Sequence, residues 1–196
     1  MTTTTNETGT VRQPGTKPVV SGAAAKSLAV LRIAFGLTFL WAFFDKLFAL
    51  GFATGRSVNP ETGVETVDRF GDAAFINGAS PTEGFLGFAA DGPFKDFYNG
   101  IAGAAWADWL FMAGLFGIGL ALTFGIVMRV GTIAGAVLYM LMWTVVLPPP
   151  NNPVLDDHVL GAISMIVLLT TAAGTTWGLG KAWNELPLVQ RQPWLK

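Results

Sequence analysis

The residues best suited to chemistry are two aspartates directly before the only histidine of the chain, Asp156, Asp157 and His158. Histidine changes its charge near neutral pH, and beside two carboxylates it can relay protons. A carboxylate at this position can also cap the helix that follows, through Asp156 or through Asp157, and a lone histidine is often a hydrogen-bonded structural residue. The triplet therefore predicts a polar site for proton transfer, with helix capping as the alternative.

A second pair of ionisable residues, Asp45 and Lys46, lies about two thirds of the way along an apolar stretch at residues 28–53. Ionisable residues inside a membrane span are costly, so they usually face the interior and mark a functional path. Neighbouring helical residues point about 100° apart, so each of the two is expected to have its own partner. Arg32, near the other end of this stretch, can extend to the membrane rim as an anchor.

Two tryptophans are expected near these charges, because Trp41 lies one turn before Asp45 and Trp143 lies one turn before the end of another apolar stretch. Belt or core aromatics are the default interpretation of both. An aromatic-lined cleft that opens to lipid and holds His, Asp and Lys also meets the needs of a quinone head, which are apolar walls, donors for two carbonyls and a proton route. The candidate catalytic residues are Asp157, His158, Lys46 and Asp45, and the candidate quinone-binding residues are Trp41, Trp143, Arg32 and Asp156.

The composition indicates that these residues are carried by a membrane protein. Of 196 residues, 52% are hydrophobic and 13% are charged, about half the charged share of soluble domains. The lack of cysteine excludes disulfides and thiolate metal sites, and a single histidine excludes a bis-histidine haem within one chain. A net charge of −1 provides no basic stripe for nucleic acid. We expect no metal, haem or flavin site and no nucleic-acid partner.

Four apolar stretches are candidates to cross the membrane, at residues 28–53, 109–128, 130–147 and 159–179. Each approaches the length of about 20 helical residues that a bilayer core of about 30 Å requires. Only residues 128–130 separate the second stretch from the third, which predicts an antiparallel hairpin with Arg129 at a tight turn. The sequence predicts an all-α fold, an integral membrane four-helix bundle over residues 28–183.

The segments outside the spans have different compositions. Residues 1–27 are rich in Thr, Pro and Gly and are expected to be a disordered cytoplasmic tail, and residues 184–196 a cytoplasmic C-terminal tail. The connection at residues 54–108 is too long for a turn and is expected to form an outer cap. A capping box at residues 80–83 and a second start at Pro93 predict short amphipathic helices, which lie in the headgroup layer or pack on the span ends.

Charge predicts the orientation of the spans, since basic residues are retained on the cytoplasmic side. With the N-terminus inside, eight of the twelve basic residues lie inside and eleven of the thirteen acidic residues lie outside, so the outer side has a formal charge of −7. Both termini are then cytoplasmic. Gly131 and Gly135 form a small-xxx-small pair, which favours packing within the bundle and leaves a homo-oligomer seam as the alternative.

Several segments together resemble the DoxX/DoxD family of four-span prokaryotic membrane proteins over residues 28–183. The segments are Leu31-Arg32-Ile33-Ala34-Phe35-Gly36, Asp45-Lys46-Leu47, Ser80-Pro81-Thr82-Glu83-Gly84-Phe85-Leu86, Gly92-Pro93-Phe94, Asp108-Trp109-Leu110-Phe111-Met112 and Asn151-Asn152-Pro153-Val154-Leu155-Asp156-Asp157-His158. The resemblance implies a multi-pass protein of the prokaryotic plasma membrane. It also implies charged family positions at Arg32, Lys46, Asp157 and His158.

Members of that family are described as membrane subunits of a thiosulfate:quinone oxidoreductase, and others as partners of a superoxide dismutase and a sulfurtransferase. The resemblance therefore implies a membrane subunit of a quinone-linked redox system, with quinone as cofactor and other redox subunits as partners. The outer charge of −7 should repel thiosulfate, which counts against a thiosulfate site in this chain. The alternative is a non-catalytic scaffold that anchors a soluble redox or oxidative-stress partner through the cap. A solute transporter is less favoured, because the spans carry few polar residues.

Overall fold

The part of the chain that the structure describes is mostly helical, with 66% of its residues in helices and almost none in strands. The computed structural model describes residues 22–150 and 152–196. Three helices in this part are long and apolar enough to cross a membrane: α1 (Gly22–Phe48), α4 (Ala105–Phe124) and α5 (Met128–Val145). A shorter apolar helix, α6 (Asp157–Thr170), has 14 residues. The sequence is thus that of a membrane protein by the length and composition of its helices.

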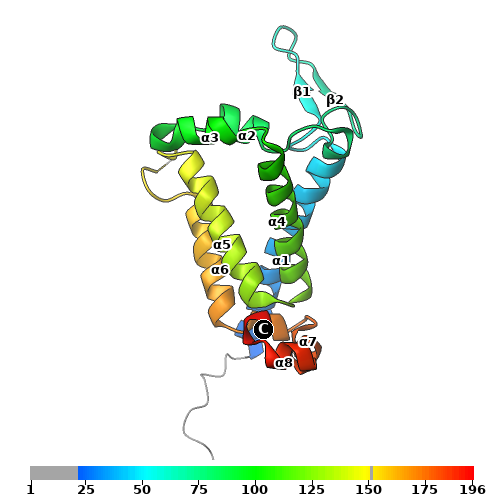
Figure 1. Cartoon of the computed structure of the whole chain (residues 1–196), viewed down its shortest axis with the longest axis vertical. Helices are drawn as coiled ribbons and strands as arrows, with labels where there is room; N and C mark the ends of the chain where they lie inside the picture. The colour runs from blue at the N-terminus through cyan, green and yellow to red at the C-terminus, as the bar shows by residue number, and fades with distance from the viewer. Residues whose placement is uncertain (1–21, 151) are drawn as a thin grey trace, which may run out of the picture.

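The long helices form two antiparallel pairs, α1 with α4 and α5 with α6 (Figure 1). At one end α4 and α5 meet closely, since a Cβ placed on Gly131 of α5 would lie 2.6 Å from the Cβ of Ala121 in α4. The two pairs diverge toward the other end, where the short helices α2 (Glu83–Phe88) and α3 (Lys95–Ile101) lie across them (Figure 1). The arrangement is V-shaped and closed at its wide end by the loop helices.

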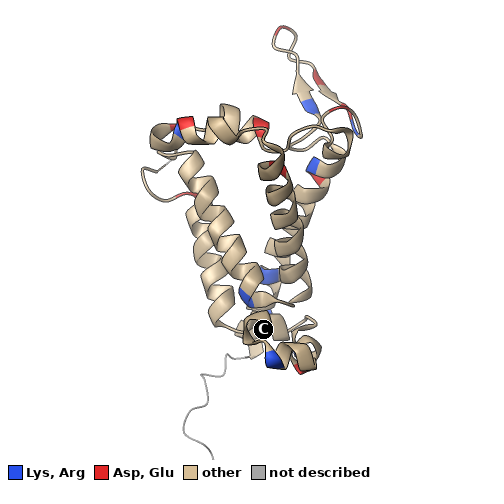
Figure 2. Ribbon diagram, viewed as in Figure 1, with Lys and Arg blue, Asp and Glu red and all other residues tan. Residues whose placement is uncertain are grey.

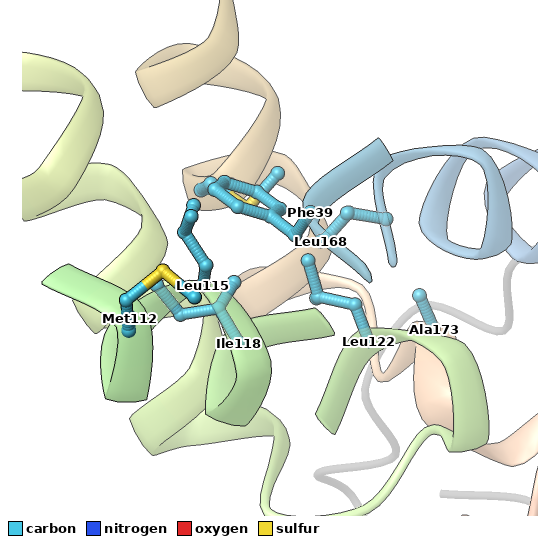
Figure 3. Close-up of a cluster of buried hydrophobic side chains, with 8 residues drawn as sticks. Phe39, Met112, Leu115, Ile118, Leu122, Leu168 and Ala173 are labelled. Carbon is cyan, nitrogen blue, oxygen red and sulfur yellow. The ribbon is translucent and has the colours of Figure 1, made fainter. Parts of the chain in front are cut away.

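One face of α4 holds the two pairs together near the narrow end. Met112, Leu115, Ile118 and Leu122 are buried and recur at helical spacing, so they share one face. They pack with side chains from the other helices, as Figure 3 shows for Phe39 of α1 and Leu168 of α6. Since lipid is as apolar as these side chains, close packing rather than removal of apolar surface from water stabilises this core.

The first helix is displaced from its predicted range of 28–53. It begins at Gly22, so residues 22–27 of the predicted tail are helical, and the rest of that tail, residues 1–21, lies outside the described residues. Three consecutive alanines after Gly22 favour this early start. The helix ends at Phe48 because Ala49 takes a positive φ of 50° and because the buried Asp45 carboxylate accepts backbone hydrogen bonds from the residues beyond.

The next two helices begin earlier than the predicted ranges of 109–128 and 130–147. The turn between them is formed by residues 125–127, and Arg129 belongs to the first turn of α5 rather than to the turn itself. Gly125 ends α4 with a φ of 72°, and a Cβ there would lie 2.6 Å from the backbone oxygen of Gly174. Only glycine combines a ready positive φ with the lack of a Cβ, so Gly125 fixes the turn at this position.

The predicted continuous helix over residues 159–179 is corrected by the structure, in which α6 ends at Thr170. The hydroxyls of Thr170 and Thr171 donate to carbonyls one turn earlier, and Ala172 takes a positive φ of 51°. A short 3-10 helix, η3 (Ala173–Thr175), follows. This segment is held by tertiary contacts instead of helical ones, including a hydrogen bond of 2.7 Å from the Leu179 amide to the Phe124 oxygen.

Arg32 joins the ends of these helices. Its side chain is fully buried, and one terminal nitrogen donates to the carbonyls of Leu122 and Thr123 at the end of α4. The other donates to the carbonyls of Thr176 (3.3 Å) and Trp177 (3.0 Å) beyond α6. These carbonyls have no partner within a helix, so the guanidinium satisfies polar groups that would otherwise be left unpaired in an apolar environment.

The predicted outer cap at residues 54–108 is folded throughout. An antiparallel hairpin that the sequence did not predict, β1 (Arg56–Val58) and β2 (Glu65–Val67), projects from it, followed by η1 (Phe75–Asn77), α2, η2 (Gly92–Phe94) and α3. The cap is tied to the second helix pair, because the Asp91 amide donates to the Val145 oxygen at 2.9 Å. Most acidic residues lie at this end of the molecule together with several basic ones, whereas the opposite end is mainly basic (Figure 2).

The C-terminal segment, predicted to be a cytoplasmic tail, contains α7 (Gly180–Glu185), α8 (Pro187–Arg191) and η4 (Pro193–Leu195). It packs on the narrow end of the V, where Arg129 Nη1 donates to the Pro193 oxygen at 2.9 Å. The start of α1 and the end of the chain therefore lie at the same end of the molecule (Figure 1).

Replacing Arg32 by methionine is expected to lower the free energy of unfolding by about 3 kcal/mol, because four buried or partly buried carbonyls lose their donor. The matched change Arg129→Met removes an exposed guanidinium with one hydrogen bond and should cost less than about 1 kcal/mol. Denaturant unfolding in mixed micelles measures both. Equal losses for the two variants would contradict the role given to Arg32.

Candidate functional site

Asp156 is the N-cap of α6. Its Oδ1 accepts the amides of His158 and Val159, both at 3.1 Å, and its Oδ2 lies 2.6 Å from Nδ1 of the His158 ring. Partial burial raises the pKa of Asp156, but the hydrogen bonds from the His158 ring and from the two amides outweigh it, so the pKa lies below its ordinary value. Asp157 is exposed in the first turn. Of the two capping alternatives, the structure selects Asp156.

His158 connects the start of α6 to the other helices through an aromatic side chain. Its ring lies edge-on to that of Tyr139 in α5, with centroids 6.5 Å apart. Tyr139 in turn lies edge-on to Phe39 (5.4 Å) and Phe35 (6.1 Å) of α1. The histidine side chain is partly exposed, and Asp156 holds its ring.

Asp45 and Lys46 have separate surroundings, as their positions on adjacent helical residues predict. The carboxylate of Asp45 accepts the amides of Phe52 (3.1 Å) and Ala53 (2.9 Å) and so closes the turn after α1. Nζ of Lys46 lies 5.9 Å from the centroid of the Phe111 ring in α4. No carboxylate of the described residues lies within ion-pair distance of Lys46. Its place in the last turn of α1 favours a cation there.

Each of the two candidate tryptophans contacts a loop that follows a helix, Trp41 the loop after α1 and Trp143 the connection after α5. Trp41 is half exposed and lies edge-on to Phe52, with centroids 4.9 Å apart. Trp143 Nε1 donates to the Val154 oxygen at 3.0 Å, which ties the proline-rich connection to α5.

The predicted site residues thus form two groups at the wide end of the V, one at the end of α1 and one at the start of α6. No hydrogen bond, ion pair or ring contact within residues 22–150 and 152–196 joins the two groups directly. Arg32, at the narrow end, belongs to neither group.

A cavity of about 430 Å³ lies between the diverging parts of α4 and α5, beneath α2 and α3. This volume falls in the range typical of small-molecule sites. The walls are almost wholly apolar, and residues from all four helices line them: Phe85, Leu86, Phe97, Tyr98, Trp106, Leu110, Phe111, Gly114, Val137, Leu138, Leu141 and Val145. Trp106, Leu110 and Val137 are more than half exposed, so the cavity opens at the apolar outer surface of the helices. None of the sequence-predicted site residues lines it.

The few polar side chains of this cavity are hydrogen-bonded. Tyr98 Oη lies 2.5 Å from Thr144 Oγ1, which joins α3 to α5. Thr82 Oγ1 donates to Oδ1 of Asp108 at 2.6 Å, which joins the start of α2 to α4. Asp108 is buried and also accepts the Ser80 hydroxyl at 2.8 Å. Asp108 is not among the site residues predicted from the sequence, although an acid in the first turn of an otherwise apolar helix is a signal for a functional residue.

Comparisons of the chain with protein-family models, with curated proteins and with solved structures find no match. Within the described part of the chain, no three His, Cys, Asp or Glu side chains gather as metal ligands do. The function is therefore argued from the cavity and from the two groups of charged residues.

Removing the N-cap carboxylate of α6 with Asp156→Ala is expected to destabilise the protein by about 1 kcal/mol at neutral pH, since the amides of His158 and Val159 lose their acceptor. The adjacent Asp157→Ala, which removes an exposed carboxylate, should cost about half of that or less. Unfolding in mixed micelles and hydrogen exchange of the Val159 amide measure the difference. A larger loss for Asp157→Ala would contradict the assignment.

The stability that the Asp156 carboxylate contributes depends on pH with a defined sign. Because the folded state lowers the pKa of Asp156 below its ordinary value of about 3.9, the carboxylate stabilises the fold fully above that pH. The contribution is lost as the pH falls through the lowered value. Asp156→Asn keeps a capping oxygen without the charge, so it should retain most of the stability at pH 7 and flatten the loss below about pH 4.

Proposed function

We propose that this chain is a membrane subunit of a quinone-linked redox system of the DoxX/DoxD type, and that the cavity between α4 and α5 receives quinone from the bilayer. The observation that carries the proposal is the cavity itself: it is apolar, rich in aromatic walls, of ligand size and open at the lipid-facing surface of the helices. A molecule dissolved in the bilayer can enter such a cavity without crossing water.

The residues of the cavity fit the apolar part of a quinone. Phe85, Phe97 and Phe111 offer ring faces and edges for contact, and Trp106 stands at the opening. A bound quinone accepts two electrons and two protons. The chain offers no electron carrier of its own in this proposal, so electrons come from another redox subunit, and the outer charge of −7 assigns thiosulfate to such a subunit as well.

The charged groups at the wide end are given supporting roles. His158, held by Asp156 and partly exposed, exchanges protons at the cap end of α6, with Asp157 beside it. Nζ of Lys46 lies 5.9 Å from the centroid of the Phe111 ring, which lines the cavity, and provides positive potential near it. Neither group touches the cavity, so both act on its surroundings.

In the membrane we propose four crossings, α1, α4, α5 and α6 with the irregular residues that follow it. α6 alone is shorter than a bilayer core, and the segment bound by Arg32 completes the distance. Both ends of the described chain lie at the narrow end of the V, where basic residues gather (Figure 2). The positive-inside rule then makes this end cytoplasmic in the plasma membrane of a prokaryotic cell.

Filling the cavity should abolish quinone binding. Gly114 lines the cavity, and a Cβ on it would meet no atom within 4 Å, so Gly114→Leu projects into the empty space without displacing backbone. We expect the affinity for decylubiquinone to fall at least about tenfold, measured by quenching of tryptophan fluorescence in nanodiscs.

The matched control is Gly117→Leu on the same helix. Gly117 is exposed, lies outside the cavity lining and also has no atom within 4 Å of a Cβ. This variant should bind decylubiquinone as the unmodified chain does. Equal affinities of both variants and of the unmodified chain would remove the support for a quinone site here.

The scaffold function remains the second candidate, and the hairpin favours it. The β1–β2 hairpin projects from the cap and exposes the apolar side chains of Val58, Val64 and Val67, which a soluble partner could cover. Replacing residues 56–67 by a short Gly-Ser linker is expected to release a docked soluble redox enzyme, with at least about tenfold less cross-linked complex in intact cells. Decylubiquinone affinity should be kept. An unchanged cross-linking pattern would remove the hairpin as a docking element.

A further inference from the structure

The hydroxyl groups in the cavity walls have no hydrogen to offer a ligand. The Tyr98 and Thr144 hydroxyls lie 2.5 Å apart, and each also lies within hydrogen-bond distance of the Leu141 oxygen, at 3.5 Å and 2.7 Å respectively. Whichever of the two donates to the other, the second donates to that oxygen. Thr82 donates to the Asp108 carboxylate. Both wall hydroxyls therefore direct their hydrogens into the protein, and beyond the first turns the backbone amides of α4 and α5 are engaged within their helices.

A quinone head does not fit this chemistry. Its two carbonyls are acceptors, and inside the cavity they would exchange water or interfacial donors for apolar walls. No Lys, Arg or His side chain of the described residues lines the cavity either. A hydrocarbon chain, in contrast, loses no hydrogen bond on entering.

The opening of the cavity offers a hydrogen-bond donor, which the interior lacks. Trp106 lies there in the first turn of α4, 60% exposed, and its indole N–H is a donor. It stands directly beneath the cap, at the level where tryptophan prefers the boundary between lipid and water. A polar head beside Trp106 keeps contact with donors and water while its chain extends between α4 and α5.

We propose that the cavity binds the hydrocarbon tail of its ligand and leaves the polar head at the opening beside Trp106. Selection then depends on the tail, which an isoprenoid quinone or an acyl lipid can supply. This inference rests on the proposed function in one respect only, namely that the polar head of the ligand is a quinone.

The test compares three probes that share parts: decylubiquinone, the same benzoquinone head without its tail, and decanol. Each competes for the full-length protein in nanodiscs, with its amount expressed as a mole fraction of the bilayer so that partitioning does not count. We expect decanol to displace decylubiquinone and the tailless head to bind at least about tenfold more weakly. Gly114→Leu should weaken the two tailed probes, and Gly117→Leu should leave their binding unchanged.

The outcomes separate this inference from the proposed function. If the tailless head binds as tightly as decylubiquinone and Gly114→Leu weakens both, the head occupies the cavity and the inference is overturned, while the quinone function stands. If decanol binds in a Gly114-dependent manner and neither quinone does, the tail site stands and the quinone function fails. Repeating the competition with farnesol and with oleic acid distinguishes an isoprenoid from an acyl tail.

Discussion

The structure depends on one buried guanidinium. Arg32 donates to four carbonyls from two segments that are far apart in the sequence, the end of α4 and the residues after α6. No carboxylate of the described residues pairs with it, so its charge is balanced by carbonyl dipoles, including those at the C-terminal end of α4. Because this contact and the close approach of α4 and α5 fix the narrow end, the helices are free to separate at the other end.

The separation of the two helix pairs creates the cavity. Two helix pairs that diverge leave a space that their own side chains do not fill, and the cap covers it at the wide end. The cavity therefore results from the inclination of the two helix pairs. Its lining consists of apolar residues that are common in any membrane helix. Charged residues lie around this space without lining it.

The apolar helices could be predicted from the sequence because hydropathy determines them. Features that a tertiary contact determines, such as the ends of these helices, could not. Apolar composition located α1, α4 and α5, but their ends were displaced because Asp45, Gly125 and Arg32 set them through contacts with distant backbone. The capping role of the triplet was foreseen as an alternative, whereas the choice of Asp156 needed the geometry. The β1–β2 hairpin is too short to show periodicity, and the cavity depends on an angle between helices that no local pattern records.

The cap has a mechanical consequence. α2 and α3 are attached to the first helix pair through Asp108 and to the second through the Tyr98–Thr144 and Asp91–Val145 hydrogen bonds. They act as a strut between two inclined legs. Because this strut joins both helix pairs, we expect it to resist their approach under lateral pressure from the surrounding lipids.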